Sequence, residues 1–265
     1  MNQPYPVIRY GILLGAFIVL ALLSVRLFRR LRWTGPSPVL AFLLFGVATF
    51  LVSEVYWGAY NLMIRDSAPA FAAMEIAEAG GFLCYASSLR AALGYEIGRD
   101  LRALAVTVGF MACNTALWIA WTGSWVKDVL TGAAMCYLVY TCLRGAIRYR
   151  VFSRPVWLAF LAGILMIFVL QTAALVIGGG TGSLLDNLCA PVWLAGILYF
   201  LVRSLRPREE DTGRDSAMVL SWMGFTWCTL AMYLSYEPIY FLPCALSYGM
   251  IVLMVRSAEQ EVAVE

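Results

Sequence analysis

The chain has 265 residues, of which 62% are hydrophobic and 13% charged, with a formal net charge of +3. Such a composition leaves too little polar surface for a water-soluble globule, and nothing in it indicates a nucleic-acid partner. Histidine is absent, which excludes His-containing zinc sites, Ser-His and Cys-His nucleophile pairs and haem ligation by His. We therefore predict an integral membrane protein whose partner is the lipid bilayer, with no cofactor and no metal site.

Long apolar stretches follow one another along the chain and do not alternate in polarity. In hydrocarbon every backbone polar group must be paired within its own segment, so such stretches predict α-helices and not barrel strands. A hydrocarbon core of ~30 Å requires about 20 residues per crossing. The fold class is therefore all-α, a polytopic transmembrane helix bundle of about nine helices. We predict crossings near residues 7–28, 37–64, 69–93, 103–121, 125–146, 155–178, 184–205, 218–236 and 238–256.

Arginine placement predicts the topology, because Lys and Arg near helix ends are retained on the cytoplasmic side during insertion. Every second gap between predicted crossings is rich in arginine. The gaps between these hold only Arg65 and Lys127, and the N-terminus holds only Arg9. We expect the N-terminus outside and the C-terminus inside the cytoplasmic (inner) membrane, with one transmembrane domain over 1–256 and a short acidic tail over 257–265. If the last two helices were re-entrant, the arginine at 256 would lie outside. Sixteen of the 19 basic residues lie in every second gap or after the last crossing: Arg26, Arg29, Arg30, Arg32, Arg90, Arg99, Arg102, Arg144, Arg148, Arg150, Arg154, Arg203, Arg206, Arg208, Arg214 and Arg256.

Three carboxylates lie inside the second and third predicted helices. A charged group in the membrane costs at least about 2.5 kcal/mol, so such a residue is a functional candidate by default. At about 1.5 Å per residue, Glu54 lies about 15 Å and Glu78 about 14 Å from the outer ends. Glu75 lies one turn from Glu78 on the same helix face. The sequence therefore predicts that Glu54 and Glu78 lie at matched depth on antiparallel neighbours.

The residues around these carboxylates predict how the third helix packs. Aromatic residues share the carboxylate faces of both helices, and an adjoining ridge of small residues on the third helix would allow close helix approach. We therefore expect the helix at 69–93 to be central. The faces are Phe50, Glu54, Trp57, Gly58 and Asn61 on the second helix, and Phe71, Met74, Glu75, Glu78, Phe82 and Tyr85 on the third; the ridge is Ala73, Ala77, Gly81, Cys84 and Ser88.

Further polar residues lie in the outer halves of other predicted helices, which predicts a polar cavity that opens outward. Seven acidic against three basic residues in this half leave a charge of −4, which would attract a cation, a protonated amine or a proton. The alternative is that buried carboxylates only hydrogen-bond neighbouring helices. The candidate ligand-binding residues are Glu54, Trp57, Asn61, Glu75, Glu78, Tyr85, Asn114, Gln171, Asp186 and Asn187.

Three functions agree with this pattern. The first is a small transporter, favoured by carboxylates near the midplane and by prolines within helices. The second is a membrane receptor or sensor subunit that binds its ligand in the outer cavity and signals through a cytoplasmic partner. The third is an intramembrane lipid-modifying enzyme with Glu54 and Glu78 as an acid/base pair. We place the transporter first, and enzymatic activity stays open.

Overall fold

The computed structural model describes residues 5–63, 73–94, 101–122, 124–149, 213–232 and 241–263. These residues form helices, and no strand occurs among them, so the all-α prediction is confirmed for this part of the chain. The helices are α1 (Tyr5–Thr34), α2 (Pro38–Met63), α3 (Ala73–Leu93), α4 (Leu101–Thr122), α5 (Trp125–Tyr149), α8 (Gly213–Met232) and α9 (Phe241–Val262).

Four of these helices contain segments long and apolar enough to cross a membrane: Tyr10–Thr34, Pro38–Tyr60, Trp125–Gly145 and Phe241–Val262. The chain is therefore an integral membrane protein. The helices coincide with the first five and last two predicted crossings. The predictions at 155–178 and 184–205 lie outside the described residues, so the count of nine stays a prediction.

The connection from α1 to α2 shows how local sequence ends one helix and starts the next. α1 continues past its predicted end at residue 28, because nothing breaks it before Gly35. Gly35 has a φ of 86°, and its N–H donates to the Leu31 carbonyl at 3.2 Å, which is a glycine C-cap. Ser37 Oγ then accepts the N–H of Leu40 at 3.5 Å, and Pro38 occupies the first turn of α2. The chain reverses direction within three residues.

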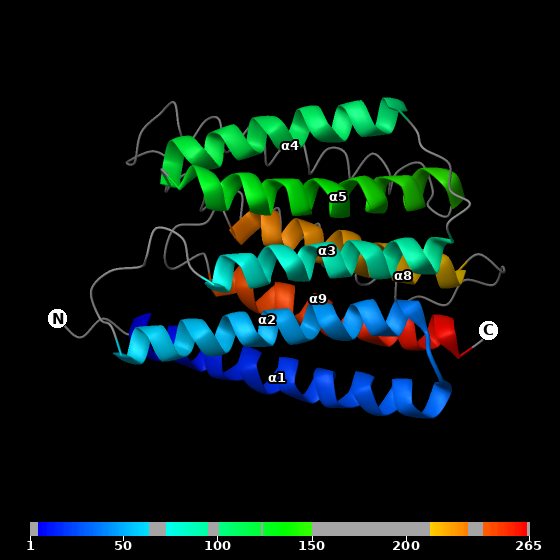
Figure 1. Cartoon of the computed structure of the whole chain (residues 1–265), viewed down its shortest axis with the longest axis horizontal. Helices are drawn as coiled ribbons and strands as arrows, with labels where there is room; N and C mark the ends of the chain where they lie inside the picture. The colour runs from blue at the N-terminus through cyan, green and yellow to red at the C-terminus, as the bar shows by residue number, and fades with distance from the viewer. Residues whose placement is uncertain are drawn as a thin grey trace.

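Five helices form a closed ring in the order α2, α3, α5, α8, α9, since each packs on the next and α9 packs back on α2. α1 lies outside the ring against α2 and α9, and α4 lies outside it against α5. Figure 1 shows these helices side by side along the long axis of the molecule. Near the middle of these helices, aromatic side chains from α2, α3 and α8 pack against one another.

α3 lies between α2 and α5 (Figure 1), as the ridge of small residues predicted. A Cβ added at Gly81 would collide with the Phe50 ring of α2. About two turns further, Ser88 Oγ donates to the Val39 carbonyl of α2 at 2.7 Å. These contacts confirm close approach on the ridge at Gly81 and Ser88.

Apart from Arg9 near the start of α1, the arginines of the described helices lie near one end of the bundle, at the right in Figure 1, where α1, α3, α5 and α9 end and α2, α4 and α8 begin. We call this the arginine end. The arginine-rich helix ends that the sequence predicted to share one side therefore lie at one end of the bundle in the described residues. Which side of the membrane this end faces stays a prediction.

α9 runs on through most of the predicted tail, to Val262. Ser257 Oγ lies 3.0 Å from Ser221 Oγ of α8, and Glu259 Oε2 lies 2.6 Å from Arg26 Nη2 of α1. α9 thus continues past residue 256, and the predicted division into a transmembrane domain and a tail stays a prediction.

Candidate functional site

Three carboxylates from α2 and α3 gather in the half of the bundle opposite the arginine end. We call Glu54, Glu75 and Glu78 the carboxylate cluster. Glu78 lies within electrostatic range of both Glu54 and Glu75, so the predicted proximity of Glu54 and Glu78 is present in the structure. Glu75 is buried and the other two are partly buried. Three acidic groups so close together, largely withdrawn from water, interact strongly with any positive charge.

Glu54 is held by one hydrogen bond from another part of the chain. The hydroxyl of Tyr248 on α9 donates to Glu54 Oε1. Glu54 Oε2 is buried and has no hydrogen-bond partner among the described residues. A buried oxygen without a donor costs about 1–3 kcal/mol. This oxygen is an acceptor available to a proton or a ligand.

Glu78 is tied to α2 through Ser53. Ser53 Oγ lies 3.4 Å from Glu78 Oε1 and 3.3 Å from the carbonyl oxygen of Met74. A serine hydroxyl has one hydrogen, so it donates to one of these oxygens at a time. Ser53 is therefore a weak and exchangeable partner for Glu78.

Glu75 forms an ion pair with Lys127 at the start of α5. Lys127 Nζ lies 3.6 Å from Glu75 Oε1, and the side chains are 25% and 7% exposed. Lys127 also lies within electrostatic range of Glu78. The lysine therefore compensates one charge of the cluster and leaves Glu54 and Glu78 as its less neutralised members.

α9 completes the site with residues that sequence reasoning missed. Cys244 interacts electrostatically with both Glu54 and Glu78, and it lies one turn before Tyr248 on the same helix face. The spacing of Cys244 and Tyr248 shows that they share a face. No sequence signal placed that face against α2.

An aromatic layer lies on the arginine side of the carboxylate cluster. It consists of Phe50, Phe82, Tyr85, Trp222 and Phe225. Ring centroids are 5.2 Å apart for Phe50 and Phe82, 5.0 Å for Tyr85 and Phe225, and 5.9 Å for Tyr85 and Trp222. Phe50 lies one turn from Glu54 on α2, and Phe82 lies one turn from Glu78 on α3, each in the direction of the arginine end. Phe50, Phe82 and Tyr85, three of the aromatic residues predicted beside the carboxylates, thus belong to a layer on their arginine side, and Trp222 and Phe225 of α8 complete it.

The other candidates lie in the aromatic layer, elsewhere on the helices, or outside the residues that the structure describes. Tyr85 is fully buried in the aromatic layer, and its hydroxyl has no hydrogen-bond partner among the described residues. Trp57 stacks near Tyr60, with centroids 6.5 Å apart. The side chain of Asn61 and all of Gln171, Asp186 and Asn187 lie outside the described residues.

Asn114 is fully buried on α4, which packs on α5. Its Nδ2 donates to the carbonyl of Phe110 at 2.9 Å, and its Oδ1 has no partner among the residues described. α4 lies outside the ring, so Asn114 belongs to a second polar position and not to the carboxylate cluster. The outward-opening cavity joining all ten candidates stays a prediction.

Comparisons with protein-family models, with curated proteins and with solved structures found no match for this chain.

Proposed function

We propose that this protein is a small transporter of the cytoplasmic membrane that binds a proton or a small amine-bearing cation between Glu54 and Glu78. The observation that carries the proposal is the buried Oε2 atom of Glu54, which has no hydrogen-bond partner among the described residues, beside a second carboxylate. A proton or cation placed there would satisfy this oxygen and reduce the repulsion between the two acids.

The charge of the cluster supports a positive ligand. Three carboxylates face one lysine, and the lysine is paired with Glu75. Two nearby acids in a poorly hydrated site titrate as a coupled pair, so uptake of one positive charge alters the binding of the next. Such coupling is what a proton-linked carrier requires.

The aromatic layer supports a transport cycle in which the site is closed toward the arginine end. Rings from α2, α3 and α8 meet directly beneath the carboxylates. For a ligand to pass, Phe50 and Phe225 must separate, which requires α8 to move relative to α2. Transporters alternate access by moving one group of helices against another around a fixed site. We propose that α8 and α9, which pack together, move as this unit.

A receptor or sensor is the second candidate, because α9 joins both ends of the molecule. Tyr248 contacts Glu54 near one end of α9, and Glu259 pairs with Arg26 near the other. The 11 residues between them rise about 16 Å along one helix. A ligand that displaced Tyr248 could shift α9 and alter the surface presented to a cytoplasmic partner.

Proton flux into proteoliposomes tests the transporter. The full chain is reconstituted with a pH-sensitive dye inside the vesicles, and a potassium diffusion potential drives proton entry, with and without methylammonium outside. We expect flux in the wild type and at least about a ten-fold loss, or 1.4 kcal/mol in the barrier, in Glu54→Gln and Glu78→Gln. Glu261→Gln, a carboxylate change at the arginine end of α9, serves as the matched control and should retain the flux.

Two outcomes decide against transport. Wild-type flux equal to that of empty vesicles under both conditions contradicts the carrier, as does undiminished flux in both cluster variants. The sensor is supported instead if methylammonium or tetramethylammonium raises the thermal stability of the wild type, and not of Glu78→Gln, without any flux.

A further inference from the structure

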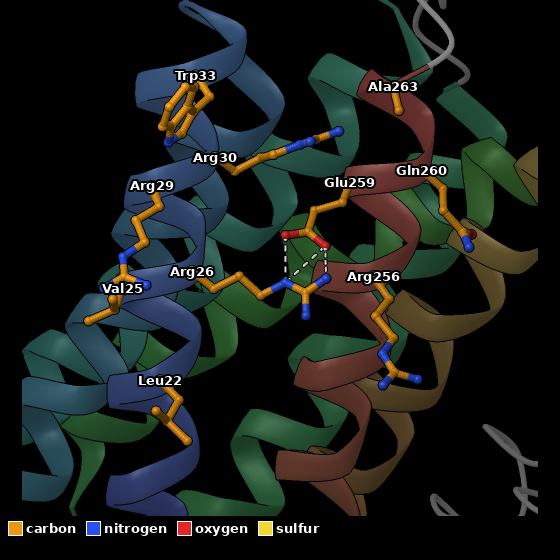
Figure 2. Close-up of a pocket in the computed structure, with 10 residues that line it drawn as sticks. All are labelled: Leu22, Val25, Arg26, Arg29, Arg30, Trp33, Arg256, Glu259, Gln260 and Ala263. Carbon is orange, nitrogen blue, oxygen red and sulfur yellow. Dashed lines mark hydrogen bonds and ion pairs between the residues drawn. The ribbon is translucent and has the colours of Figure 1, made fainter.

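A groove lies between α1 and α9 at the arginine end, far from the carboxylate cluster. Its volume is about 900 Å³. Figure 2 shows its walls, with Arg26 and Arg30 projecting from α1 toward α9 and Glu259 lying between the helices. The groove is lined by Leu22, Val25, Arg26, Arg29, Arg30, Trp33, Arg256, Glu259, Gln260 and Ala263.

The groove is strongly basic. Four arginines against one glutamate leave a charge of +3. Arg26 is occupied by Glu259, with Nε 2.8 Å from Oε1 and Nη2 2.6 Å from Oε2. The charges of Arg29, Arg30 and Arg256 are therefore in excess over the carboxylate that the groove supplies.

Arg30 provides a second observation that points to an anion. Its Nε atom is buried and has no hydrogen-bond partner among the described residues. In Figure 2 its side chain extends from α1 across the groove. A guanidinium group suits a phosphate, which accepts two parallel hydrogen bonds from it. The structure thus places an unused donor beside excess positive charge.

An apolar track leads from the groove along α1. Leu14, Ile18, Leu22 and Val25 are 61%, 48%, 65% and 50% exposed, and their spacing places them on one helix face. The 11 residues from Leu14 to Val25 rise about 16 Å, which is close to half of a ~30 Å hydrocarbon core. Trp33, 85% exposed at the other edge of the groove, suits the headgroup level of a bilayer.

We propose that the α1–α9 groove is a binding site for an anionic phospholipid. The excess positive charge of Arg29, Arg30 and Arg256 in the groove attracts the phosphate, and an acyl chain follows the track from Val25 to Leu14. The continuity of basic groove and apolar track favours a lipid over a soluble anion, because a soluble anion makes no use of the track. Basic pockets between helix ends are suited to such headgroups. This site is separate from the carboxylate cluster and does not depend on the function proposed for it.

Native mass spectrometry of the full chain in detergent micelles tests the site, with phosphatidylglycerol as the anionic probe and phosphatidylcholine as the neutral one. We expect the double variant Arg30→Gln/Arg256→Gln to bind phosphatidylglycerol at least about ten-fold more weakly, equivalent to about 1.4 kcal/mol. Arg32→Gln removes one positive charge, as each single substitution of the double variant does, from the same end of α1 without lining the groove. This control should change the affinity by less than about two-fold, the size of a screened surface-charge effect.

Equal weakening by Arg32→Gln would overturn the site in favour of diffuse surface charge. Displacement of phosphatidylglycerol by millimolar inorganic phosphate or glycerol phosphate would overturn the lipid in favour of a soluble anion. If the double variant does not fold, Arg256→Gln alone decides, because this side chain is exposed. An unchanged affinity in a folded Arg256→Gln variant also contradicts the proposal.

Discussion

At the scale of single residues, Glu54 of the carboxylate cluster has one carboxylate oxygen that accepts a hydrogen bond and one that accepts none from the described residues. Tyr248 donates to Glu54 Oε1, while Oε2 is buried without a partner in the described part of the chain. Folded proteins pair nearly all buried polar atoms, so an unpaired one indicates a functional constraint or a bound group. Glu54 therefore depends on Tyr248 more than a solvated glutamate would.

Tyr248→Phe should destabilise the protein by about 1–3 kcal/mol, because it leaves a partly buried carboxylate without its donor. Thermal unfolding of purified protein in one detergent measures the change. Tyr10→Phe is the matched control, since Tyr10 is 52% exposed on α1 and its hydroxyl loss should be nearly neutral. Equal melting temperatures for the two variants would contradict the dependence of Glu54 on Tyr248.

Two ion pairs in the described helices, Glu75–Lys127 and Glu259–Arg26, differ in burial, and this difference predicts different energies. Glu75 and Lys127 are 7% and 25% exposed, whereas Glu259 and Arg26 are 11% and 57% exposed. Removing one partner of a largely buried pair leaves an uncompensated charge, and typically costs about 3–5 kcal/mol. An exposed pair contributes about 0–1 kcal/mol.

Lys127→Met should therefore lower stability more than Arg26→Met, by several kcal/mol against about 1 kcal/mol or less. Adding Glu75→Met to Lys127→Met should recover most of the loss, because the buried carboxylate that Lys127 pairs with is then removed as well. Thermal unfolding of the three variants provides the comparison. A double variant no more stable than Lys127→Met would mean that the lysine acts through packing and not through its charge.

At the scale of helices, sequence reasoning worked where one local rule decides the outcome. The ridge of small residues on α3 predicted close approach to a neighbour, and Gly81 and Ser88 make it against α2. The matched depth of Glu54 and Glu78 followed from antiparallel helices of known rise. The contact of Tyr248 with Glu54 spans 194 residues, and no local pattern encodes a pairing at that separation.

Gly80 and Gly81 form a matched pair that tests the α2–α3 interface. A Cβ at Gly81 would collide with the Phe50 ring, whereas a Cβ at Gly80 meets nothing within 4 Å. Phe50 is held by Phe82, Tyr85 and Phe225, so the ring has little freedom to move aside.

Gly81→Ala should therefore destabilise the protein by about 1–3 kcal/mol through overpacking. Gly80→Ala should be neutral or stabilising by up to about 1 kcal/mol, because alanine is the better helix former. Thermal unfolding of the two variants measures both effects. Equal destabilisation would show that the interface is not tight at Gly81.

At the scale of the whole molecule, the sequence predicted helices and a common end for the arginines but not the ring of α2, α3, α5, α8 and α9. The reason is physical. In a bilayer an apolar side chain gains little free energy by moving from lipid to a contact with another helix. Apolar periodicity therefore does not identify which helices are neighbours. Neighbours are selected by small residues and by polar contacts such as Ser88 with Val39 and Tyr248 with Glu54, which only the assembled bundle reveals.

The ring also separates charge along the molecule. Arginines gather at one end, where the α1–α9 groove lies, and the carboxylate cluster lies in the other half. If the arginine end faces the cytoplasm, its arginines contact the anionic lipids of the cytoplasmic leaflet. The carboxylate cluster is then nearer the outer surface, from which cations would reach it. Both proposals therefore share one orientation, which can be measured independently of any ligand.

Cysteines placed at the two ends of α2 measure this orientation in a background without the native thiols. Pro36 is exposed in the turn at the arginine end, and Met63 is 82% exposed at the other end of the helix. Because arginines are retained inside during insertion, Met63→Cys should react with an impermeant maleimide on intact cells. Pro36→Cys should react only after the membrane is opened. The reverse pattern would place the carboxylate cluster toward the cytoplasm, and reaction of both residues on intact cells would mean that α2 does not span the membrane.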